Sequence, residues 1–298
     1  MTDLFQFLIA GVALGAVYAL VALGFVVIFR ATGVVNFAQG GFVVLGAYLT
    51  HQFAVRMGLP FAAGVALAMA VVAGLGFLVE RVVLRRMVGH PIFATVLITL
   101  GINILVEQVA TAIWGYDLLP MGDPWGVRTV TVAGVMIKLI DLWTVAAAAA
   151  LLGLFFLIFR RSSVGVAMRA AAVDPEAALA HGINPAVIHA LSWAIAGAVA
   201  AVAGVFLASG PRGVDSTLSP IAFRAFPAMI LGGVDSTEGA VAGGLLIGVV
   251  EVLSAAYLTP NATALGANIH TVIPYLVMIL VLVVRPHGLF GTVEVRRI

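Results

Sequence analysis

Long apolar stretches separated by short polar breaks make up most of this chain. Eight stretches approach or exceed the length that crosses a bilayer: 4–29, 37–55, 60–79, 92–114, 142–159, 186–209, 239–258 and 269–284. A ninth, 222–233, is shorter and is expected to cross as a half-helix or to enter and turn back. A spanning helix needs about 20 mainly apolar residues, with every backbone polar group bonded internally. The pattern therefore predicts an all-α polytopic membrane protein with about eight or nine transmembrane helices, some of them broken.

Composition agrees with a membrane protein and removes several classes of function. The chain has 298 residues, 63% hydrophobic and 9% charged, whereas soluble domains carry about 25% charged residues. Cysteine is absent, which excludes disulfides and cysteine-ligated metals, and the net charge of +2 does not suggest a nucleic-acid binder. Because no positive segment precedes the first apolar stretch, we interpret that stretch as a span rather than a signal peptide.

Basic residues give the expected orientation. They follow the third, fifth and last spans, in the groups Arg81, Arg85 and Arg86; Arg160, Arg161 and Arg169; and Arg285, Arg296 and Arg297. The positive-inside rule assigns these loops to the cytoplasm. With nine crossings the amino terminus is external and the carboxyl terminus cytoplasmic. The whole chain, 1–298, is expected to form a single transmembrane domain with a long external loop at about 115–141 and a long cytoplasmic loop at about 160–185.

The cytoplasmic loop contains a predicted short helix. Asp174 is suited to cap exposed N–H groups, Pro175 fits the first turn, and Glu176 favours the positive end of the helix dipole. Alanines extend the helix towards His181, and Gly182 can close it. The loop is longer than a simple connector requires, which favours a functional role. The alternative is an amphipathic helix resting on the lipid surface.

Four motifs resemble those of one known family. They are Arg169–Ala178 with Gly182-Ile183-Asn184; Gly33–Gly41 with Leu45–Tyr48; Leu231–Ala240 with Gly243-Gly244; and Arg285–Gly291. In this order, over nearly the whole chain, they resemble branched-chain amino acid ABC permeases, the LivH/LivM family, and its LivH-type subunit in particular. One departure is Gln39-Gly40-Gly41, where many relatives have His-Gly-Glu, so no ionisable role is expected there.

The resemblance implies a permease subunit in a bacterial inner membrane. It implies a second homologous permease, two ABC ATPase subunits that bind ATP and Mg, and an external solute-binding protein. The cytoplasmic loop would dock on an ATPase, through Arg169, Asp174, Pro175, Glu176, Ala177 and Gly182. No P-loop motif occurs in this chain, so it is expected to hold no cofactor and to catalyse no reaction.

Two interrupted segments are candidates for the substrate pathway, because transporters often break their helices at the binding site. The candidate residues are Asn36, Phe37, Gln39, Gly40 and Gly41 in the first segment and Gly232 and Gly233 in the second. We expect a neutral, largely apolar path. Close packing of helices through small residues is the alternative explanation for the glycines.

Two carboxylates fall inside predicted spans, Glu107 and Glu251. Such a group is costly in a membrane unless it is paired or protonated. An interfacial position or contact with a partner subunit is favoured over a proton relay. Two other functions stay open: an ABC permease for urea or short amides, and a stand-alone secondary carrier or channel driven by one of these carboxylates.

Overall fold

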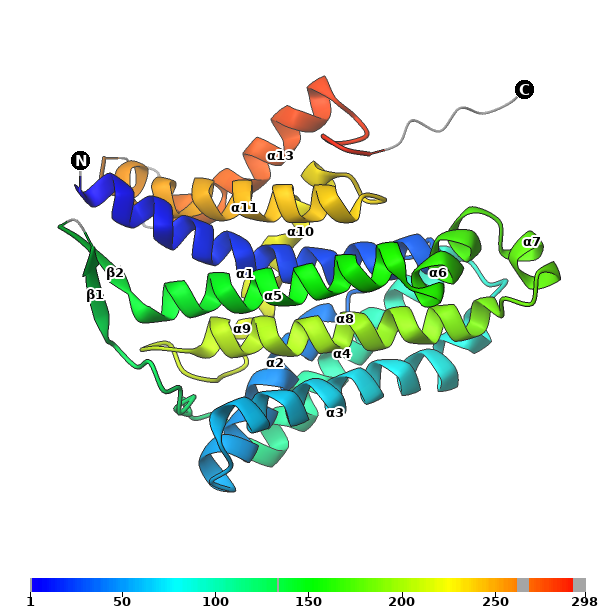
Figure 1. Ribbon diagram of the computed structural model, residues 1–298, viewed down its shortest axis with the longest axis horizontal. Coiled ribbons are helices and arrows are strands. Elements are labelled where there is room, and N and C mark those ends of the chain that lie inside the picture. The colour runs from blue at the N-terminus through cyan, green and yellow to red at the C-terminus, as the bar shows by residue number, and fades with distance from the viewer. Residues whose placement is uncertain (1, 133, 262–267, 292–298) are drawn as a thin grey trace.

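The computed structural model describes residues 2–132, 134–261 and 268–291. Six helices are long and apolar enough to cross a membrane. They belong to α1 (Thr2–Thr32), α3 (Phe61–Val82), α4 (Ile92–Trp114), α5 (Leu139–Arg161), α8 (Pro185–Ala208) and α11 (Thr237–Leu253). Each matches one of the apolar stretches in the sequence, and α1 and α11 lie side by side with α5 and α8 in one bundle (Figure 1).

Shorter helical segments account for the remaining apolar stretches. The first is α2 (Gln39–Thr50), continued by a π-helical turn at His51–Arg56. The stretch at 222–233 is part of a broken unit made of α9 (Leu218–Ala222), a 3₁₀ turn at Phe223–Ala225 and α10 (Phe226–Gly232). The last is a 3₁₀ turn at Ile269–Thr271 followed by α13 (Ile273–Val284). The expected all-α polytopic architecture with broken helices is confirmed.

Three further helical turns follow the long helices α3 and α11. Leu84–Met87 is a 3₁₀ turn after α3, Ser254–Leu258 is a π-helical turn after α11, and α12 (Thr259–Asn261) follows it.

A carboxyl-terminal strap, residues 285–291, continues from α13. In it the N–H groups of Leu289 and Phe290 donate to the carbonyls of Leu231 and Gly232, at 2.8 and 3.0 Å. The strap therefore holds the end of α10.

Close packing of small residues joins the central helices. A Cβ on Gly244 of α11 would lie 2.5 Å from Cα of Ala19 in α1, and a Cβ on Gly248 would collide with the backbone of Gly15. Membrane helices pack in this way because water does not drive them together and backbone proximity increases dispersion contact. The repeats Gly11-x-x-x-Gly15 and Gly244-x-x-x-Gly248 therefore serve close packing of α1 against α11.

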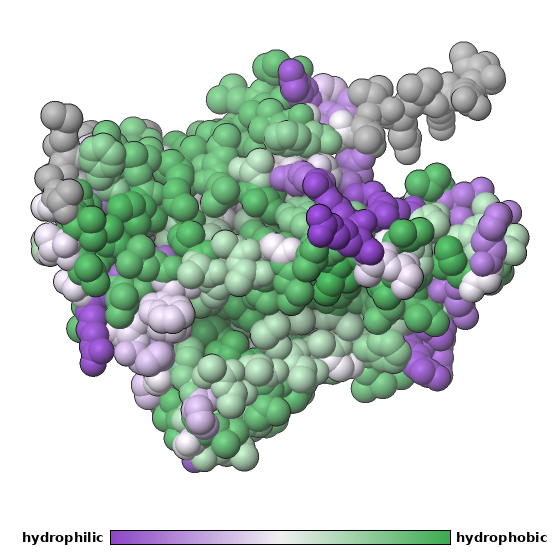
Figure 2. Space-filling model, in the orientation of Figure 1, coloured by the Kyte–Doolittle hydropathy of each residue, from purple (hydrophilic) through white to green (hydrophobic). Residues whose placement is uncertain are grey.

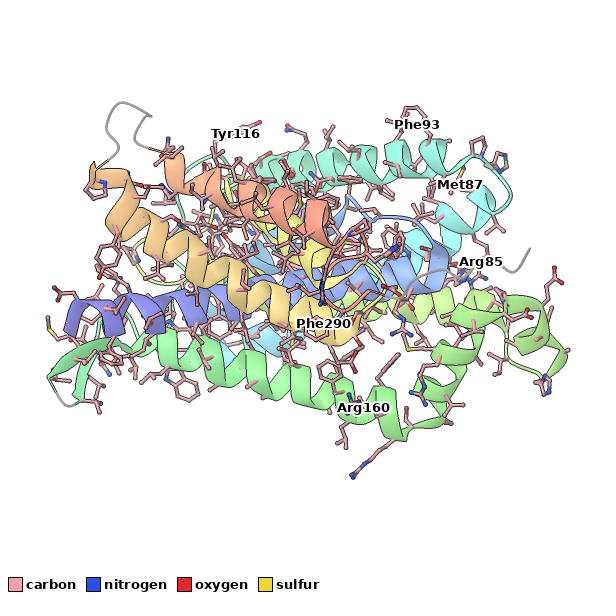
Figure 3. The ribbon with its side chains drawn as sticks, turned by 90° about the horizontal axis from the view of Figure 1, so that it is seen from above. Arg85, Met87, Phe93, Tyr116, Arg160 and Phe290 are labelled. Carbon is pink, nitrogen blue, oxygen red and sulfur yellow. The ribbon has the colours of Figure 1, made fainter. Side chains whose placement is uncertain are left out.

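The two ends of the molecule differ. The amino terminus and a hairpin of β1 (Thr129–Val132) and β2 (Val135–Lys138) lie at one end, and α7 (Pro175–Ala180) lies at the other (Figure 1). Between them the visible surface is mostly hydrophobic, as expected for a face in contact with lipid (Figure 2). The loops after α3 and α5, which carry basic residues assigned to the cytoplasm, are at the α7 end, where Figure 3 places Arg85. Arg296 and Arg297 lie outside the described residues. We call the α7 end the cytoplasmic end, after the orientation that the positive-inside rule predicts.

Two elements were missing from the sequence interpretation. The segment 115–141 was expected to be a loop, but its β-branched residues Thr129–Val132 pair with Val135–Lys138 as an antiparallel hairpin. The cytoplasmic loop was expected to hold one short helix, but α6 (Ser163–Val173) precedes it. The Ser162 hydroxyl caps α6 by accepting from the N–H of Gly165 at 3.1 Å. Ser162 is the sequence signal for this helix, because serine is a favoured residue at the start of a helix.

Candidate functional site

The cytoplasmic loop folds as its cap residues predict. Oδ1 of Asp174 accepts hydrogen bonds from the N–H groups of Glu176 and Ala177, at 3.0 and 2.9 Å. Pro175 occupies the first turn of α7, and Gly182 has φ of +81°, a conformation that closes a helix with little strain only for glycine. Asn184 then caps α8 through the N–H of Ala186. Two caps thus fix both ends of the segment between α6 and α8.

The surface of this loop carries uncovered apolar side chains. Val173 is 86% exposed and Leu179 is 59% exposed, at the end of the molecule furthest from the hairpin. Arg169 points inward instead: its guanidinium donates to the carbonyl of Phe159 and lies over that ring. The structure therefore separates the residues expected to dock. Asp174, Pro175, Glu176 and Ala177 are exposed on α7, whereas Arg169 fastens α6 to the end of α5.

The first broken segment is held by side-chain amides. Asn36 and Gln39 are fully buried. Nδ2 of Asn36 donates to Oε1 of Gln39 at 3.2 Å, and Oδ1 of Asn36 accepts from the N–H of Ala38 at 2.9 Å. Nε2 of Gln39 reaches the carbonyl of Ala196 in α8 at 3.3 Å. These bonds replace the helical ones that the chain loses between α1 and α2, which is what a membrane interior requires of irregular backbone.

A row of polar side chains on α4 faces this segment. Thr99, Asn103 and Glu107 are four residues apart and share one face of the helix. Oγ1 of Thr99 accepts from the N–H of Phe37 at 3.1 Å, and Oδ1 of Asn103 accepts from the N–H of Gly41 at 2.6 Å. Nδ2 of Asn103 donates to Oε1 of Glu107 at 2.5 Å. Much of the rest of α4 is exposed apolar surface, so this row is a polar strip on an outlying helix.

The second interrupted segment contacts the first one through α9 and the 3₁₀ turn that follows it. Nδ2 of Asn103 also lies 3.5 Å from Oγ of Ser219, and a Cβ on Gly40 would stand 2.5 Å from that oxygen. It would also stand 2.9 Å from the ring of Phe223. The ring of Phe37 lies 6.1 and 5.9 Å from those of Phe223 and Phe226. A residue larger than glycine would not fit at position 40, because Ser219 and Phe223 approach α2 too closely. We call Gly40, Asn103, Glu107, Ser219 and Phe223, with Phe37, the polar wall.

Gly232 and Gly233 lie elsewhere. A Cβ on Gly232 would collide with the backbone of Gly239 in α11, and one on Gly233 would lie 2.5 Å from the N of Gly291 in the strap. Gly233 also has φ of +108°, which L side chains rarely adopt. Both glycines serve a tight turn between α10 and α11. The part of the second segment that reaches the first is 218–226, six or more residues before the expected position.

An ion pair lies near the wall, on the other side of the 3₁₀ turn. Nη1 of Arg224 is 2.8 Å from Oε1 of Glu251, and the hydroxyl of Tyr18 donates to Oε2 at 2.7 Å. Glu251 is buried within the chain, so it does not face a partner subunit, which was one of the two positions that had been favoured. The pathway was expected to be free of paired buried charge, but Arg224 directly follows the wall residue Phe223. Arg224 could have been found as the single charge in the apolar stretch 222–233.

Sequence reasoning also missed Asn103 and Ser219. Asn103 and Glu107 stand four residues apart in the apolar stretch 92–114, a spacing that places both on one helical face. The spacing was therefore a sequence signal for Asn103 as well as for the carboxylate of Glu107. Ser219 carried no signal, because its contact with Asn103 depends on how α9 packs. Among the residues that the structure describes, no group of three or more His, Asp and Glu side chains could hold a metal ion.

Comparison with known proteins agrees with this architecture. The family model for the branched-chain amino acid transport system / permease component matches residues 7–282. The high-affinity branched-chain amino acid transport system permease protein LivH of Escherichia coli (strain K12) is 30% identical, over 97% of this chain and 96% of the relative. The corresponding protein BraD of Pseudomonas aeruginosa is 29% identical, over 98% and 97%.

Among solved structures, PsaBC from Streptococcus pneumoniae in complex with Fab overlaps with a TM-score of 0.46 and 14% identity, over 92% of this chain and 88% of that chain. The family match covers most of the chain, and the relatives are aligned along nearly their whole length. This chain is a multi-pass membrane protein that belongs to the family of branched-chain amino acid transport system permease components.

Proposed function

We propose that this chain is the transmembrane permease subunit of an ABC importer and carries branched-chain amino acids past the polar wall. The observation that supports this most is the strip on α4, where Asn103 joins both broken segments while the rest of the helix is largely exposed. A half-buried carboxylate, Glu107, on an outlying membrane helix is costly in contact with lipid. A homologous second permease covers this face, and the pathway runs between the two.

The chemistry of the wall suits an aliphatic amino acid. Glu107 is an acceptor for the substrate ammonium group, and Asn103 and Ser219 are neutral partners for polar atoms. Phe37 and Phe223 form an aromatic surface against which an aliphatic side chain packs. Binding here need only be weak, because an external solute-binding protein sets the affinity. A path for urea or short amides would not need an acceptor for an ammonium group.

The exposed helix α7 supports a separate ATPase as the motor. It is capped at its start, closed at Gly182, and directly connected to α8 through the Asn184 cap. Val173 and Leu179 would be solvated apolar groups unless a partner covers them. An ATPase subunit on each permease docks there and binds ATP and Mg. The chain itself is non-catalytic, and the assembly lies in the bacterial inner membrane.

Substrate selectivity tests this proposal. Cells lacking the chain are complemented with it, and the uptake of labelled leucine, isoleucine and valine is measured with urea and acetamide as competitors. We expect the three amino acids to be imported and to compete with one another, and the amides to have no effect. Uptake of urea in place of the amino acids would reassign the substrate.

A Glu107→Gln variant should lower leucine uptake about tenfold or more, because a charge-assisted hydrogen bond is lost.

A further inference from the structure

A cavity at the cytoplasmic end lies apart from the polar wall. Its volume is about 210 Å³, it is open on one side, and it is lined by the ends of α1 and α3, the start of α4 and the first half of α8. The polar side chains that line it are Thr32, Glu80, His90, Thr95 and His189. Figure 3 shows Met87, another lining residue, at the same end as Arg85. Ligand pockets typically combine an apolar surface with a few convergent polar groups, and this cavity has both.

Glu80 is the charged group of this cavity. It is 3% exposed, and Nη2 of Arg85 is 3.1 Å from its Oε2. Among the residues that the structure describes, Arg85 is the side chain that bonds this carboxylate, and it reaches only the one oxygen. A buried carboxylate is stable only when its oxygens are well paired, because desolvation is costly. The second oxygen is therefore available to a hydrogen-bond donor that enters the cavity.

The other side chains that line the cavity indicate which further chemical groups the ligand has. Leu84, Ile92 and Trp193 provide an apolar surface beside Glu80. His90 and Thr95 lie on the α4 side and can donate to an anionic or carbonyl group. A ligand with an ammonium group for Glu80, a carboxylate for His90 and Thr95, and a short aliphatic chain for the apolar surface fits this lining. Resting on the function proposed above, we propose that this cavity is a second amino-acid site, filled from the cytoplasm by the aliphatic amino acid that the importer delivers.

The position of Arg85 gives the site a consequence for transport. The same Nη2 that contacts Glu80 donates to the carbonyl of Ala186 at 2.9 Å. Ala186 is in the first turn of α8, directly after the loop that carries α7. A ligand on Glu80 therefore acts on the link between α3 and the helix that transmits motion from α7. Delivered amino acid that accumulates in the cytoplasm occupies the site and slows further import.

Binding to the complex of permeases and ATPases in nanodiscs, prepared without the external binding protein, tests the site. The probes are L-leucine, isopentylamine, which lacks the carboxylate, and 4-methylpentanoate, which lacks the ammonium group. We expect leucine to bind most tightly and isopentylamine to bind more tightly than 4-methylpentanoate. Glu80→Gln should weaken leucine binding roughly ten- to a hundredfold, since a charge-assisted hydrogen bond is lost. Ile92→Trp, which fills the cavity and leaves Glu80 in place, should also abolish binding.

Two controls separate this site from others. Glu238→Gln removes a different carboxylate of the cytoplasmic end, one that pairs with Arg160 at 2.8 Å outside the cavity, and should leave leucine binding unchanged. Asn103→Leu alters the polar wall and should also leave the cytoplasmic binding intact. The nanodiscs are prepared with phosphatidylcholine alone and with added phosphatidylethanolamine, because that headgroup also carries a primary ammonium group.

Each result of these binding measurements supports or overturns the second amino-acid site. Leucine binding that survives both Glu80→Gln and Ile92→Trp overturns the site. If binding is lost in Asn103→Leu alone, the polar wall is the only amino-acid site and the proposed function stands without this inference. Displacement of leucine by phosphatidylethanolamine would make the headgroup the occupant and overturn the amino-acid assignment. Leucine uptake by the same importer reports the proposed function separately, so its failure is recognised independently.

Discussion

Asn103 connects three elements through one side chain. It bonds the backbone of Gly41 at the start of α2, Glu107 one turn along α4, and Ser219 of α9. An amide is the side chain that does this best, because it donates and accepts at the same time without carrying a charge. A leucine of similar size would leave the N–H of Gly41 and the carboxylate of Glu107 without this partner.

We predict that Asn103→Leu lowers substrate uptake about tenfold and reduces stability by roughly 1–2 kcal/mol, in keeping with measured hydrogen bonds between membrane helices. Uptake and thermal unfolding in detergent are measured on the same preparation. Gln108→Leu is the matched control, because it removes an amide from the exposed side of α4. Equal uptake by both variants would remove Asn103 from the wall.

The Arg224–Glu251 pair is predicted to matter for stability. Arg224→Met leaves the buried Glu251 carboxylate with only the Tyr18 hydroxyl, which should cost about 3–5 kcal/mol. Adding Glu251→Gln to the same chain should recover much of that loss, because no unpaired charge is left. Thermal unfolding in detergent measures both. Arg212→Met, at an exposed arginine, is the control, and simple additivity of the two losses would contradict an ion pair.

At the scale of the element, local chemistry explains what could be predicted. The cap at Asp174, the proline at the first turn and the glycine after the helix are local signals, and α7 forms where they place it. The contact between α2 and α9 is different, because it depends on how distant segments pack. The sequence could show that Gly40 needs space but could not show that Ser219 and Phe223 take it. For Gly232 and Gly233 the small size was recognised, and the reason proved to be a tight turn.

The prediction at this scale concerns α7. Asp174→Ala removes a cap worth about 1 kcal/mol, and Asp174→Asn keeps a good capping residue. We expect the alanine variant to lose part of its substrate-stimulated ATP hydrolysis and the asparagine variant to retain it. Leu179→Asp, which places a charge on the exposed apolar surface, should abolish the stimulation with normal membrane insertion. Full stimulation in the Leu179→Asp variant would show that the ATPase docks elsewhere.

At the scale of the whole molecule, the two ends face different compartments. The six long helices and the shorter segments account for every apolar stretch of the sequence, and the basic loops gather at the α7 end. Orientation in the membrane follows from those charges. We therefore predict that the hairpin end is external and that the α7 end is cytoplasmic.

Cysteine labelling tests this orientation, and the chain has no native cysteine to interfere. Thr129, Ser163 and Ala180 are exposed positions in the hairpin, α6 and α7. In intact cells an impermeant thiol reagent should modify Thr129→Cys and leave Ser163→Cys and Ala180→Cys unmodified. All three should react after the membrane is opened. The reverse pattern in intact cells would place α7 outside and exclude its contact with an ATPase.

The most direct test of the central claim is leucine uptake by proteoliposomes that contain this chain with its partner permease, ATPases and binding protein. Labelled leucine is followed with ATP on the ATPase side, and separately with a proton or sodium gradient and no ATP. We predict accumulation that requires ATP and the binding protein, and no accumulation driven by either gradient alone. Accumulation driven by a gradient without ATP would contradict the account and identify a stand-alone carrier.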